Sequence, residues 1–483
     1  MASPRENGSD GAAPVGQNAR SAEGALGREL ASLLSPEQVV TGGPDLREAL
    51  SDGTANQGIE GEAELLALPA STEEVAAVLG WCYRHDVPVV TRGGGTGLAA
   101  GAVPHGGVVL STERLDRVRS MDPGLWRMEA EAGVRTATIH RIALENGLFF
   151  PPDPGAGEQS TLGGNIATNA GGPHTFKYGV TKAWVTGLEA VIAPGEILKL
   201  GGPVRKDVSG LDLLDLLIGS EGTLGIVTAA WLRLVPAPEA RAGVVAFFEG
   251  AAEGCEAIIS VMGTGIQSST LEFLDHGALE ASLGSFPFDR PERPGFAVIA
   301  EADGHPDEVS RVAAELEEVF SQGGSSQVLS LAGRSEIGSL WDWRDRVSPA
   351  VAAKRGGKIS EDVVVPLERF GEAVAGTLAI GERNGLEACS WGHAGDGNLH
   401  STFLVDLDDP EQMERGRAAA GQLFSMAIEL GGSISGEHGI GSLKLDRVTD
   451  ALDRNAVRLQ AEVKKAFDPK LLLNPGKKVP LTG

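Results

Sequence analysis

The sequence predicts an α+β protein of two domains, because its two halves are patterned differently. Up to residue 236, glycine-rich loops join strand-like runs to amphipathic helices, which is typical of α/β organisation. The segment from Pro236 to Pro238 then indicates a domain boundary. Beyond it, long amphipathic helices and short strand-like runs favour an antiparallel sheet with helices packed on one side. A chain of 483 residues is also too long for one ordinary core.

The first half carries clear local signals. Ser71 and Glu74 form a capping box, and the apolar residues that follow recur at helical spacing. A strand at 87–90 then runs into the first glycine-rich loop. We expect further strands at 107–110, 125–130 and 226–235, and a helix at 136–146.

The second half is expected to contain strands at 295–301 and 363–366, a β-hairpin at 391–400 and a helix at 451–467. The hairpin is predicted because Asp396 and Gly397 form a dipeptide favoured in two-residue type I′ turns. This register places His393 directly opposite His400, with Cβ atoms roughly 4.5–5.5 Å apart. Two imidazoles at that spacing can hold one divalent metal, although a histidine pair can also be purely structural.

A second short motif, from Ser435 to Gly441, offers partners for this histidine pair. Glu437 can serve as a third ligand, and the adjacent His438 as a base beside the metal. Two imidazoles and one carboxylate suit zinc, with manganese or iron as alternatives.

Composition excludes several classes of function. The formal net charge is −25, so nucleic acid and an anionic membrane surface are not expected as partners. No run of about 18 apolar residues occurs, so we expect no membrane span. Cys82, Cys255 and Cys389 are too scattered for a zinc or iron–sulfur motif, and they favour a reducing, cytoplasmic setting. Residues 1–24 are polar and lack a signal core, which predicts a disordered tail.

Three glycine-rich stretches in the first half predict a phosphate-containing cofactor. Glycine lets backbone N–H groups approach phosphate oxygens, because no Cβ stands in the way. The run from Gly93 to Gly101 matches neither the Rossmann spacing nor a Walker A loop. A single such loop could be a plain turn. Three of them, together with Asn165 and Asn169, instead indicate a long diphosphate cofactor threaded between them.

The motifs resemble those of a known flavoprotein family. Residues 92–104, 162–172, 177–179, 219–225 and 474–476 are similar to the FAD domain of flavoproteins related to vanillyl-alcohol oxidase and p-cresol methylhydroxylase. The latter half resembles the FAD-linked oxidase C-terminal domain of D-lactate, glycolate and D-2-hydroxyglutarate dehydrogenases. The resemblance implies a two-subdomain FAD-binding domain, a cap domain over the flavin with an antiparallel sheet flanked by helices, and a C-terminal helix that returns to the FAD domain. We therefore expect an FAD domain at 25–236, a cap domain at 237–445 and a returning segment at 446–483.

The resemblance also implies which residues hold FAD. Some relatives attach the flavin through a histidine in the first loop, where this chain has Gly95 and Thr96, so noncovalent FAD is expected. His174 is the alternative attachment point, although a histidine bonded within its own loop is the favoured interpretation. The implied cofactor residues are Arg92, Gly93, Gly94, Gly95, Thr96, Gly97, Leu98, Pro152, Gly163, Gly164, Asn165, Thr168, Asn169, Gly171, Gly172, Gly179, Glu221, Gly222, Ile226 and Asn474.

In the hydroxyacid branch of this family, the motifs matching residues 391–400 and 435–441 supply the metal ligands and the base. This implies His393, His400 and Glu437 as ligands and His438 as the catalytic base. A divalent cation lowers the pKa of the substrate hydroxyl, the base takes its proton, and the Cα hydride passes to flavin N5.

The substrate's carboxylate also needs cations, and the resemblance points to two of them. Arg344 and Lys358 are implied as its clamp and Ser348 as a hydroxyl that binds the acid, although a solvated helix face is the alternative for the basic residues. Thr402 stands where D-2-hydroxyglutarate dehydrogenases tend to carry Asn, which favours a substrate other than a dicarboxylate.

The implied activity is an FAD-dependent, metal-assisted oxidation of a D-2-hydroxy acid, with D-lactate or glycolate favoured and D-2-hydroxyglutarate as the alternative. Electrons are expected to pass to a separate quinone, cytochrome or electron-transfer flavoprotein, because the chain has neither iron–sulfur cysteines nor a nicotinamide motif. The protein would then be cytoplasmic, peripheral to the membrane through its acceptor, and a candidate homodimer. Other classes considered are a redox-neutral enzyme like alkyl-dihydroxyacetonephosphate synthase and a non-catalytic FAD-binding subunit.

Overall fold

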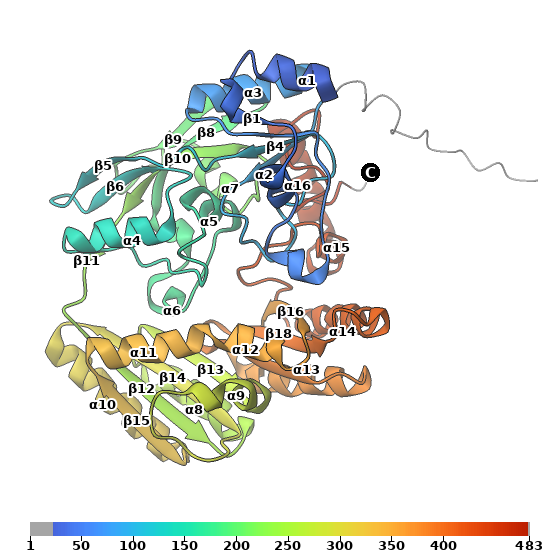
Figure 1. The fold of residues 1–483 in the computed structure, drawn as a ribbon. Helices are drawn as coiled ribbons and strands as arrows, with labels where there is room; N and C mark the ends of the chain where they lie inside the picture. Colours follow the sequence, from blue (N-terminus) through green and yellow to red (C-terminus); the bar gives the residue numbers. More distant parts are fainter. Residues whose placement is uncertain (1–22, 482–483) are drawn as a thin grey trace, which may run out of the picture.

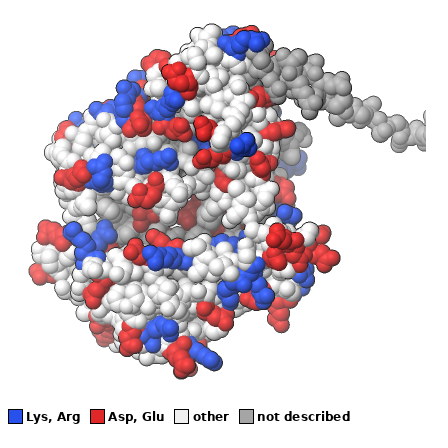
Figure 2. Space-filling model, in the orientation of Figure 1, with Lys and Arg blue, Asp and Glu red and all other residues white. Residues whose placement is uncertain are grey.

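The computed structural model describes residues 23–481, which form two lobes (Figure 1). The disordered tail predicted at 1–24 lies outside the described residues, except that Glu23 and Gly24 begin helix α1 (Glu23–Leu30). The first lobe contains the chain up to Pro236 and the C-terminal helices, and the second begins with strand β12 (Ala240–Phe248). The residue limits proposed for the domains stay predictions. Acidic and basic side chains are interspersed on the face drawn in Figure 2.

The first lobe has two main sheets, of which only the smaller contains parallel pairs. The four-stranded sheet has the order β1-β2-β4-β3, with β2–β4 and β4–β3 parallel. Every pair in the five-stranded sheet, β5-β6-β10-β8-β9, is antiparallel. The strands are β1 (Val39–Val40), β2 (Leu65–Ala67), β3 (Val89–Arg92), β4 (Val108–Ser111), β5 (Val118–Asp122), β6 (Arg127–Glu131), β8 (Val185–Ile192), β9 (Glu196–Gly201) and β10 (Ile226–Arg233).

Side-chain caps start two helices of the first lobe, α3 and α5, and the cap of α3 was predicted. Helix α3 begins after Ser71, whose hydroxyl accepts a hydrogen bond of 3.1 Å from the backbone N–H of Glu74. Within the second glycine-rich stretch, Thr161 caps α5 in the same way. The helices are α2 (Pro44–Ala49), α3 (Thr72–Arg84), α4 (Thr136–Glu145), α5 (Leu162–Thr168), α6 (Thr175–Tyr178) and α7 (Leu213–Leu217), and a two-stranded pair joins β7 (Leu148–Phe149) to β11 (Val235–Pro236).

The second lobe is a seven-stranded antiparallel sheet of order β15-β12-β14-β13-β17-β18-β16. Helices cover both faces of this sheet, so the expectation of helices on one side is wrong. The reason lies in the strands, since eight successive residues of β14 are buried. The strands are β12, β13 (Thr270–Asp275), β14 (Phe296–Gly304), β15 (Gln327–Ala332), β16 (Gly357–Val364), β17 (Ala388–His393) and β18 (Asn398–Val405).

Each face of the sheet packs against its helices through a separate apolar core. The larger one contains residues of the helices on one face, α8, α10, α13 and α14, and the other contains residues of α9, α11 and α12. Helices α11 and α12 lie on the side of this lobe that faces the first lobe (Figure 1). The helices are α8 (Ala251–Thr264), α9 (His276–Ser282), α10 (Pro306–Gln322), α11 (Arg334–Asp345), α12 (Val347–Ala353), α13 (Phe370–Arg383) and α14 (Pro410–Glu429).

The chain returns to the first lobe through two helices, α15 (Val448–Ala451) and α16 (Arg454–Phe467), where one helix was predicted. The break falls at Asp453, whose carboxylate accepts a hydrogen bond of 2.8 Å from the backbone N–H of Asn455 and so starts α16 anew. The buried ammonium of Lys464 then donates to the carbonyl of Thr223 at 2.6 Å, which holds α16 against the first lobe. Within residues 23–481, no helix combines the length and apolarity that a membrane crossing requires.

Candidate active site

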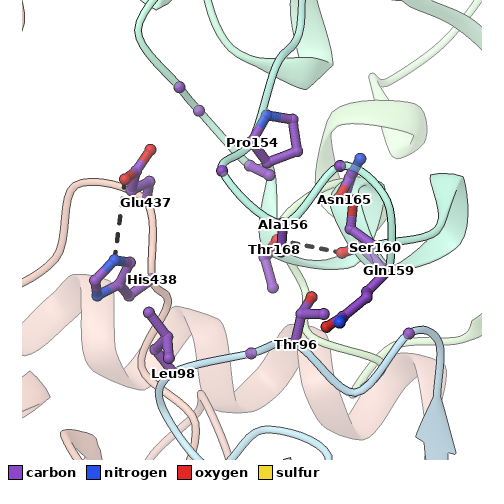
Figure 3. A pocket seen from close by; sticks show the side chains of 18 of the residues that line it. Thr96, Leu98, Pro154, Ala156, Gln159, Ser160, Asn165, Thr168, Glu437 and His438 are labelled. Atoms are coloured by element: carbon purple, nitrogen blue, oxygen red, sulfur yellow. Dashed lines mark hydrogen bonds and ion pairs between the residues drawn. The ribbon is translucent and has the colours of Figure 1, made fainter. Parts of the chain in front are cut away.

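A cavity of about 1050 Å³ lies between the two lobes and brings together most of the predicted site residues (Figure 3). Its walls come from the glycine-rich stretches of the first lobe and from strands and loops of the second. The predicted residues that line it are Gly93, Gly94, Gly95, Thr96, Gly97, Leu98, Gly163, Gly164, Asn165, Thr168, Gly171, Gly172, Glu221, Gly222, Arg344, Ser348, Lys358, His393, His400, Glu437 and His438.

The first glycine-rich loop has the properties that a diphosphate requires. Among the described residues, no hydrogen-bond acceptor lies on the backbone N–H groups of residues 93–98, although all six residues line the cavity. A Cβ on Gly93 would stand 2.5 Å from Oγ1 of Thr161, and one on Gly94 would collide with the carbonyl oxygen of Gln159. Gly95 has φ +67°, which favours glycine. These residues therefore fit a diphosphate that accepts from backbone donors.

Six of the predicted cofactor residues lie outside the cavity wall, and the structure shows what two of them do. The guanidinium of Arg92 donates to the carbonyl of Ser51. The side-chain amide of Asn474 donates to the carbonyls of Gly101 at 2.9 Å and Glu221 at 2.7 Å, which ties the C-terminal segment to two cofactor loops. These contacts hold the cofactor loops in place from outside the cavity wall. The six are Arg92, Pro152, Asn169, Gly179, Ile226 and Asn474.

Replacing Gly94 with alanine is expected to weaken FAD binding by about 10-fold or more, because overpacking of a tight contact costs about 1–3 kcal/mol. The added methyl group meets the carbonyl of Gln159, so the loop must shift away from its place in the wall. FAD content of the purified protein measures the effect. Gly42→Ala is the matched control, since nothing lies within 4 Å of a Cβ at that position; equal FAD retention by both variants would contradict the prediction.

The hairpin of the second lobe differs in register from the prediction. Its strands are β17 and β18, and Trp391, not His393, pairs with His400. Residues 394–396 form a turn of 3-10 helix that ends at Gly397, with φ +69°. This turn replaces the two-residue turn predicted at Asp396 and Gly397, so the loop is longer than expected.

The two histidines nevertheless face each other. Since Trp391 opposes His400, His393 lies two residues further along the same face and is the diagonal neighbour of His400. The centroids of the two imidazole rings are 5.2 Å apart. His393 is also paired with Glu272 of the adjacent strand β13.

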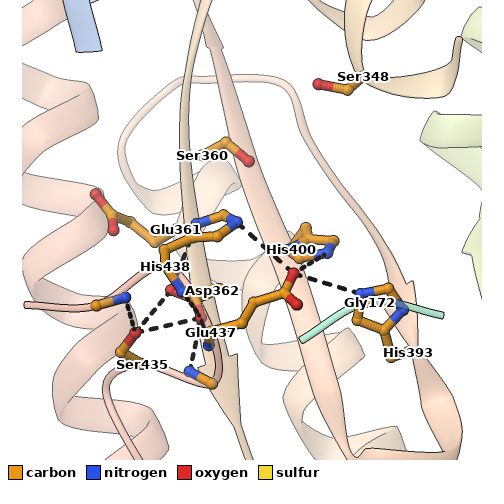
Figure 4. Close-up of polar contacts among 12 residues, drawn as sticks. Gly172, Ser348, Ser360, Glu361, Asp362, His393, His400, Ser435, Glu437 and His438 are labelled. Carbon is orange, nitrogen blue, oxygen red and sulfur yellow. Dashed lines mark hydrogen bonds and ion pairs between the residues drawn. The ribbon is translucent and has the colours of Figure 1, made fainter. Parts of the chain in front are cut away.

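Glu437 completes a group that could hold a metal. The candidate ligand atoms of His393, His400 and Glu437 all lie within 4.8 Å of one another. Oε1 of Glu437 is 3.4 Å from Nε2 of His393 and 3.5 Å from Nε2 of His400 (Figure 4). Two imidazoles and one carboxylate form the donor set of many catalytic zinc sites. The chemistry of the donors therefore fits a divalent metal.

Two of the three side chains, His400 and Glu437, have the protonation that a metal requires, whereas burial would lower the pKa of His393 but Glu272 and Glu437 raise it above its ordinary value. Burial lowers the pKa of His400 to about 3, which keeps its ring neutral. Burial alone would raise the pKa of Glu437, but the adjacent His393 lowers it to about 2. A neutral imidazole and an ionised carboxylate are the forms that bind a metal.

Asp362 holds the segment that carries Glu437 and His438. Its Oδ2 accepts hydrogen bonds from the backbone N–H groups of Gly436 at 2.6 Å, Glu437 at 2.6 Å and His438 at 3.1 Å. Its Oδ1 accepts from the ammonium of Lys444 at 2.7 Å. Neither Asp362 nor Lys444 was predicted, because the sequence gives no sign of a contact between residues so far apart.

Glu221 joins the same segment to the first lobe. Its carboxylate accepts from the backbone N–H of Ile440 at 2.8 Å and from that of Gly441 at 2.7 Å. A Cβ on Gly439 would lie 2.8 Å from Glu221 Oε1, so the approach is close. The side chain of this predicted cofactor residue is therefore used to place the loop of His438 beside the cofactor loops.

His438 lies in the cavity wall next to the metal-ligand group, across from the second glycine-rich stretch (Figure 3). Its ring stacks on that of His400, with centroids 5.2 Å apart and planes 7° from parallel. Nδ1 is 3.5 Å from Oδ1 of Asp362, and Nε2 is 3.9 Å from Oε1 of Glu437. A proton acceptor thus stands directly beside the candidate metal site.

Lys358 and Arg344 both line the cavity, but only the charge of Arg344 is neutralised by a carboxylate of the described chain. Burial lowers the pKa of Lys358 to about 8, and within the described part of the chain no carboxylate lies within 4.0 Å of its ammonium. Its Nζ donates to Oγ of Ser348 at 2.5 Å and lies 4.8 Å from the ring centroid of Trp391. The guanidinium of Arg344 is instead paired with the buried carboxylate of Glu272. Lys358 is therefore the cation with charge left for an anionic ligand.

A buried histidine in the second glycine-rich stretch completes the wall. Nδ1 of His174 is 2.5 Å from Oδ2 of Asp153, and Nε2 is 3.6 Å from Oε1 of Glu301. Burial would lower the pKa of His174, but the two carboxylates raise it to about 10. The indole N–H of Trp341 donates to the other oxygen of Glu301 at 2.5 Å. This network links the two lobes, and apart from the histidine itself no sequence pattern predicts it.

Comparisons with known proteins show the family of this chain. The family model described as an FAD binding domain matches residues 63–201, and the one described as the C-terminal domain of FAD linked oxidases matches residues 237–478. The chain is 37% identical to the glycolate oxidase subunit GlcD of Bacillus subtilis (strain 168), over 85% of this chain and 87% of that protein. It is 33% identical to D-lactate dehydrogenase of Anaerostipes hadrus, over 92% and 95%.

The fold has a solved counterpart in p-cresol methylhydroxylase. The two structures superpose with a TM-score of 0.80 at 18% sequence identity, over 97% of this chain and 98% of that one. The fold class and the resemblance predicted from the motifs are confirmed. The chain belongs to the FAD-linked oxidase family and is an FAD-linked oxidoreductase of the glycolate oxidase, D-lactate dehydrogenase and D-2-hydroxyglutarate dehydrogenase type.

Proposed function

We propose that this chain oxidises a short D-2-hydroxy acid, D-lactate or glycolate, to the 2-oxo acid with the help of a divalent metal. The observation that carries the proposal is that one cavity contains the three candidate ligands, an adjacent histidine, an unneutralised lysine and the glycine-rich cofactor loops. The names of the relatives support this substrate class.

The cations of the cavity wall bind the substrate's carboxylate. Lys358 supplies a charge that no carboxylate of the described chain neutralises, and the hydroxyl of Ser348 next to it adds a donor. Arg344 uses Nε and Nη2 on Glu272, so its Nη1 is the nitrogen available to a substrate. Thr402 forms a hydrogen bond of 2.8 Å with Ser360 of the cavity wall. D-2-hydroxyglutarate dehydrogenases tend to carry Asn at this position, and the difference favours a short acid over a dicarboxylate.

His438 removes the proton of the substrate's hydroxyl group. Its ring stands beside His400 and Glu437, which would hold the metal, so His438 is placed to accept a proton from a hydroxyl bound there. The contact of its Nδ1 with Asp362 leaves Nε2 to accept the proton. When bound, FAD accepts the hydride and the metal lowers the hydroxyl's pKa. His393, His400 and Glu437 would hold that metal, with zinc favoured over manganese and iron.

The electrons then leave to a separate acceptor, a quinone, a cytochrome or an electron-transfer flavoprotein. Cys82, Cys255 and Cys389 are free thiols buried in three different apolar cores, so they form no thiolate cluster for a relay. We also propose noncovalent FAD, since the first loop has glycine and threonine where an attachment residue would stand. A homodimer in the cytoplasm, peripheral to the membrane only through the acceptor, fits this role.

Anaerobic stopped-flow reduction tests the proposal. The visible flavin band is followed after the protein is mixed with D- and L-lactate, glycolate and D-2-hydroxyglutarate, with and without a chelator. The expected result is rapid bleaching by D-lactate or glycolate that the chelator abolishes. Bleaching only by D-2-hydroxyglutarate would replace D-lactate and glycolate as the proposed substrates. Bleaching that persists with chelator would show that the reaction needs no metal. A protein that carries FAD but is bleached by no hydroxy acid would instead point to redox-neutral chemistry or a purely structural flavin.

A further inference from the structure

Glu272 is a buried carboxylate behind the candidate metal site, and its two oxygens have different partners. Its side chain is 0% exposed. Oε1 lies 2.5 Å from Nδ1 of His393, and Oε2 accepts from Nε and Nη2 of Arg344 at 2.9 Å and 2.5 Å. One carboxylate thus contacts both a candidate metal ligand and a candidate substrate-binding residue.

The sheet dictates this arrangement. Glu272 stands on β13 directly opposite His393 on β17, so the pairing of the two strands fixes the distance between the side chains. Its neighbours on the strand, Leu271 and Phe273, are buried in apolar cores. A carboxylate inside such a sheet costs free energy unless it is fully paired. Both of its oxygens are paired, which makes Glu272 a built part of the site.

The contact with Glu272 determines which nitrogen of His393 is available. A carboxylate oxygen accepts, so Nδ1 of His393 carries a proton and Nε2 is the nitrogen available to a metal. Nε2 is the atom that lies 3.4 Å from Oε1 of Glu437. The ring is therefore held in the tautomer and orientation that a metal ligand needs.

We propose that Glu272 is the positioning residue that couples metal binding to recognition of the substrate's carboxylate. It fixes His393 for the metal, and it holds Arg344 in the cavity wall with Nη1 left for the acid. The inference deepens the proposed function and rests on it, since it requires that His393, His400 and Glu437 hold a metal.

The test is Glu272→Gln in the full-length, FAD-loaded protein, with zinc affinity measured by chelator competition. His393 and Arg344 lie on different oxygens of Glu272, and glutamine keeps an oxygen at only one of these positions, so it cannot accept from both. We expect zinc affinity to fall by about 10- to 100-fold, the usual effect of losing such a partner, while FAD content stays unchanged. His400→Ala, which removes a ligand outright, sets the scale for complete loss.

Asp275→Asn is the matched control. Asp275 lies three residues further along β13, is equally buried, and accepts from the backbone N–H groups of Ala278 at 3.0 Å and Ser390 at 2.6 Å. It touches neither His393 nor Arg344, so the same carboxylate-to-amide change is expected to leave zinc affinity as in the wild type. Wild-type zinc affinity in Glu272→Gln would overturn the inference. If the wild-type protein binds no zinc, the proposed metal site itself is refuted.

A second variant separates positioning of His393 from simple pairing with Arg344. Glu272→Leu combined with Arg344→Met leaves no unpaired buried charge and no acceptor for Nδ1 of His393, so the double variant is expected to fold even if the single one does not. Zinc affinity stays low in the double variant if Glu272 acts on His393. Recovery of wild-type zinc affinity would show that Glu272 only neutralises Arg344, which would also overturn the inference.

Discussion

Replacing His438 with alanine is expected to slow flavin reduction by about 100-fold or more, the usual contribution of a positioned general base. The effect falls on proton removal, because His438 stands beside the metal-ligand group and is not one of its three members. The backbone N–H of residue 438 still donates to Asp362 in the variant, so the loop keeps its anchor. FAD and zinc are therefore expected to remain bound.

Stopped-flow reduction by the preferred hydroxy acid gives the rate, and flavin absorbance and zinc content show whether the site is intact. His305→Ala serves as the control, since His305 lies in the second lobe with its side chain 64% exposed. Reduction by His438→Ala at nearly the wild-type rate would exclude His438 as the base. Loss of zinc from that variant would instead assign His438 to the metal site.

The parts of the site that were predicted from sequence are those encoded in short, contiguous motifs. The loop at 93–98 needs glycines at fixed positions because a Cβ would meet Thr161 or Gln159, and such a need is visible in the sequence. The hairpin shows where this reasoning stops. The predicted turn was wrong, and the strands pair two residues away from the predicted register. The two histidines still share a face, because side chains alternate between faces and an even shift keeps each one on its face.

The missed residues act over long distances in the chain. Asp362 and Lys444 are 82 residues apart, and Glu272 and His393 are 121 apart. Each pair meets only because sheet order and lobe packing bring the strands and loops together. No local sequence pattern distinguishes a buried acid such as Asp362 or Glu272 from an acid on the surface. The residues that support the ligands could therefore not be identified without the fold.

Replacing Lys444 with methionine is expected to lower the stability of the fold strongly. Its side chain is 1% exposed, and its ammonium donates to Asp362 at 2.7 Å and to the carbonyl of Ile434 at 3.1 Å, with Glu361 at 3.3 Å. Lys444→Met leaves these carboxylates buried without their cation, so the free energy of unfolding is expected to fall by about 3–5 kcal/mol. Urea denaturation of the FAD-loaded protein measures it. Lys465→Met is the control, because this lysine is 54% exposed and its pair with Glu462 is expected to contribute at most about 1 kcal/mol.

Two further observations would identify the cause of that loss. Burial alone would raise the pKa of Asp362, but Lys444 and His438 hold it below its ordinary value. A lowered pKa means that the pair stabilises the fold above the ordinary carboxyl range and that this contribution is lost as pH falls. The difference between wild type and Lys444→Met is therefore expected to shrink at acidic pH. Adding Asp362→Asn should recover part of the stability at neutral pH, because the variant then buries one charge fewer; a double variant as unstable as the single one would place the cause in packing and not in charge.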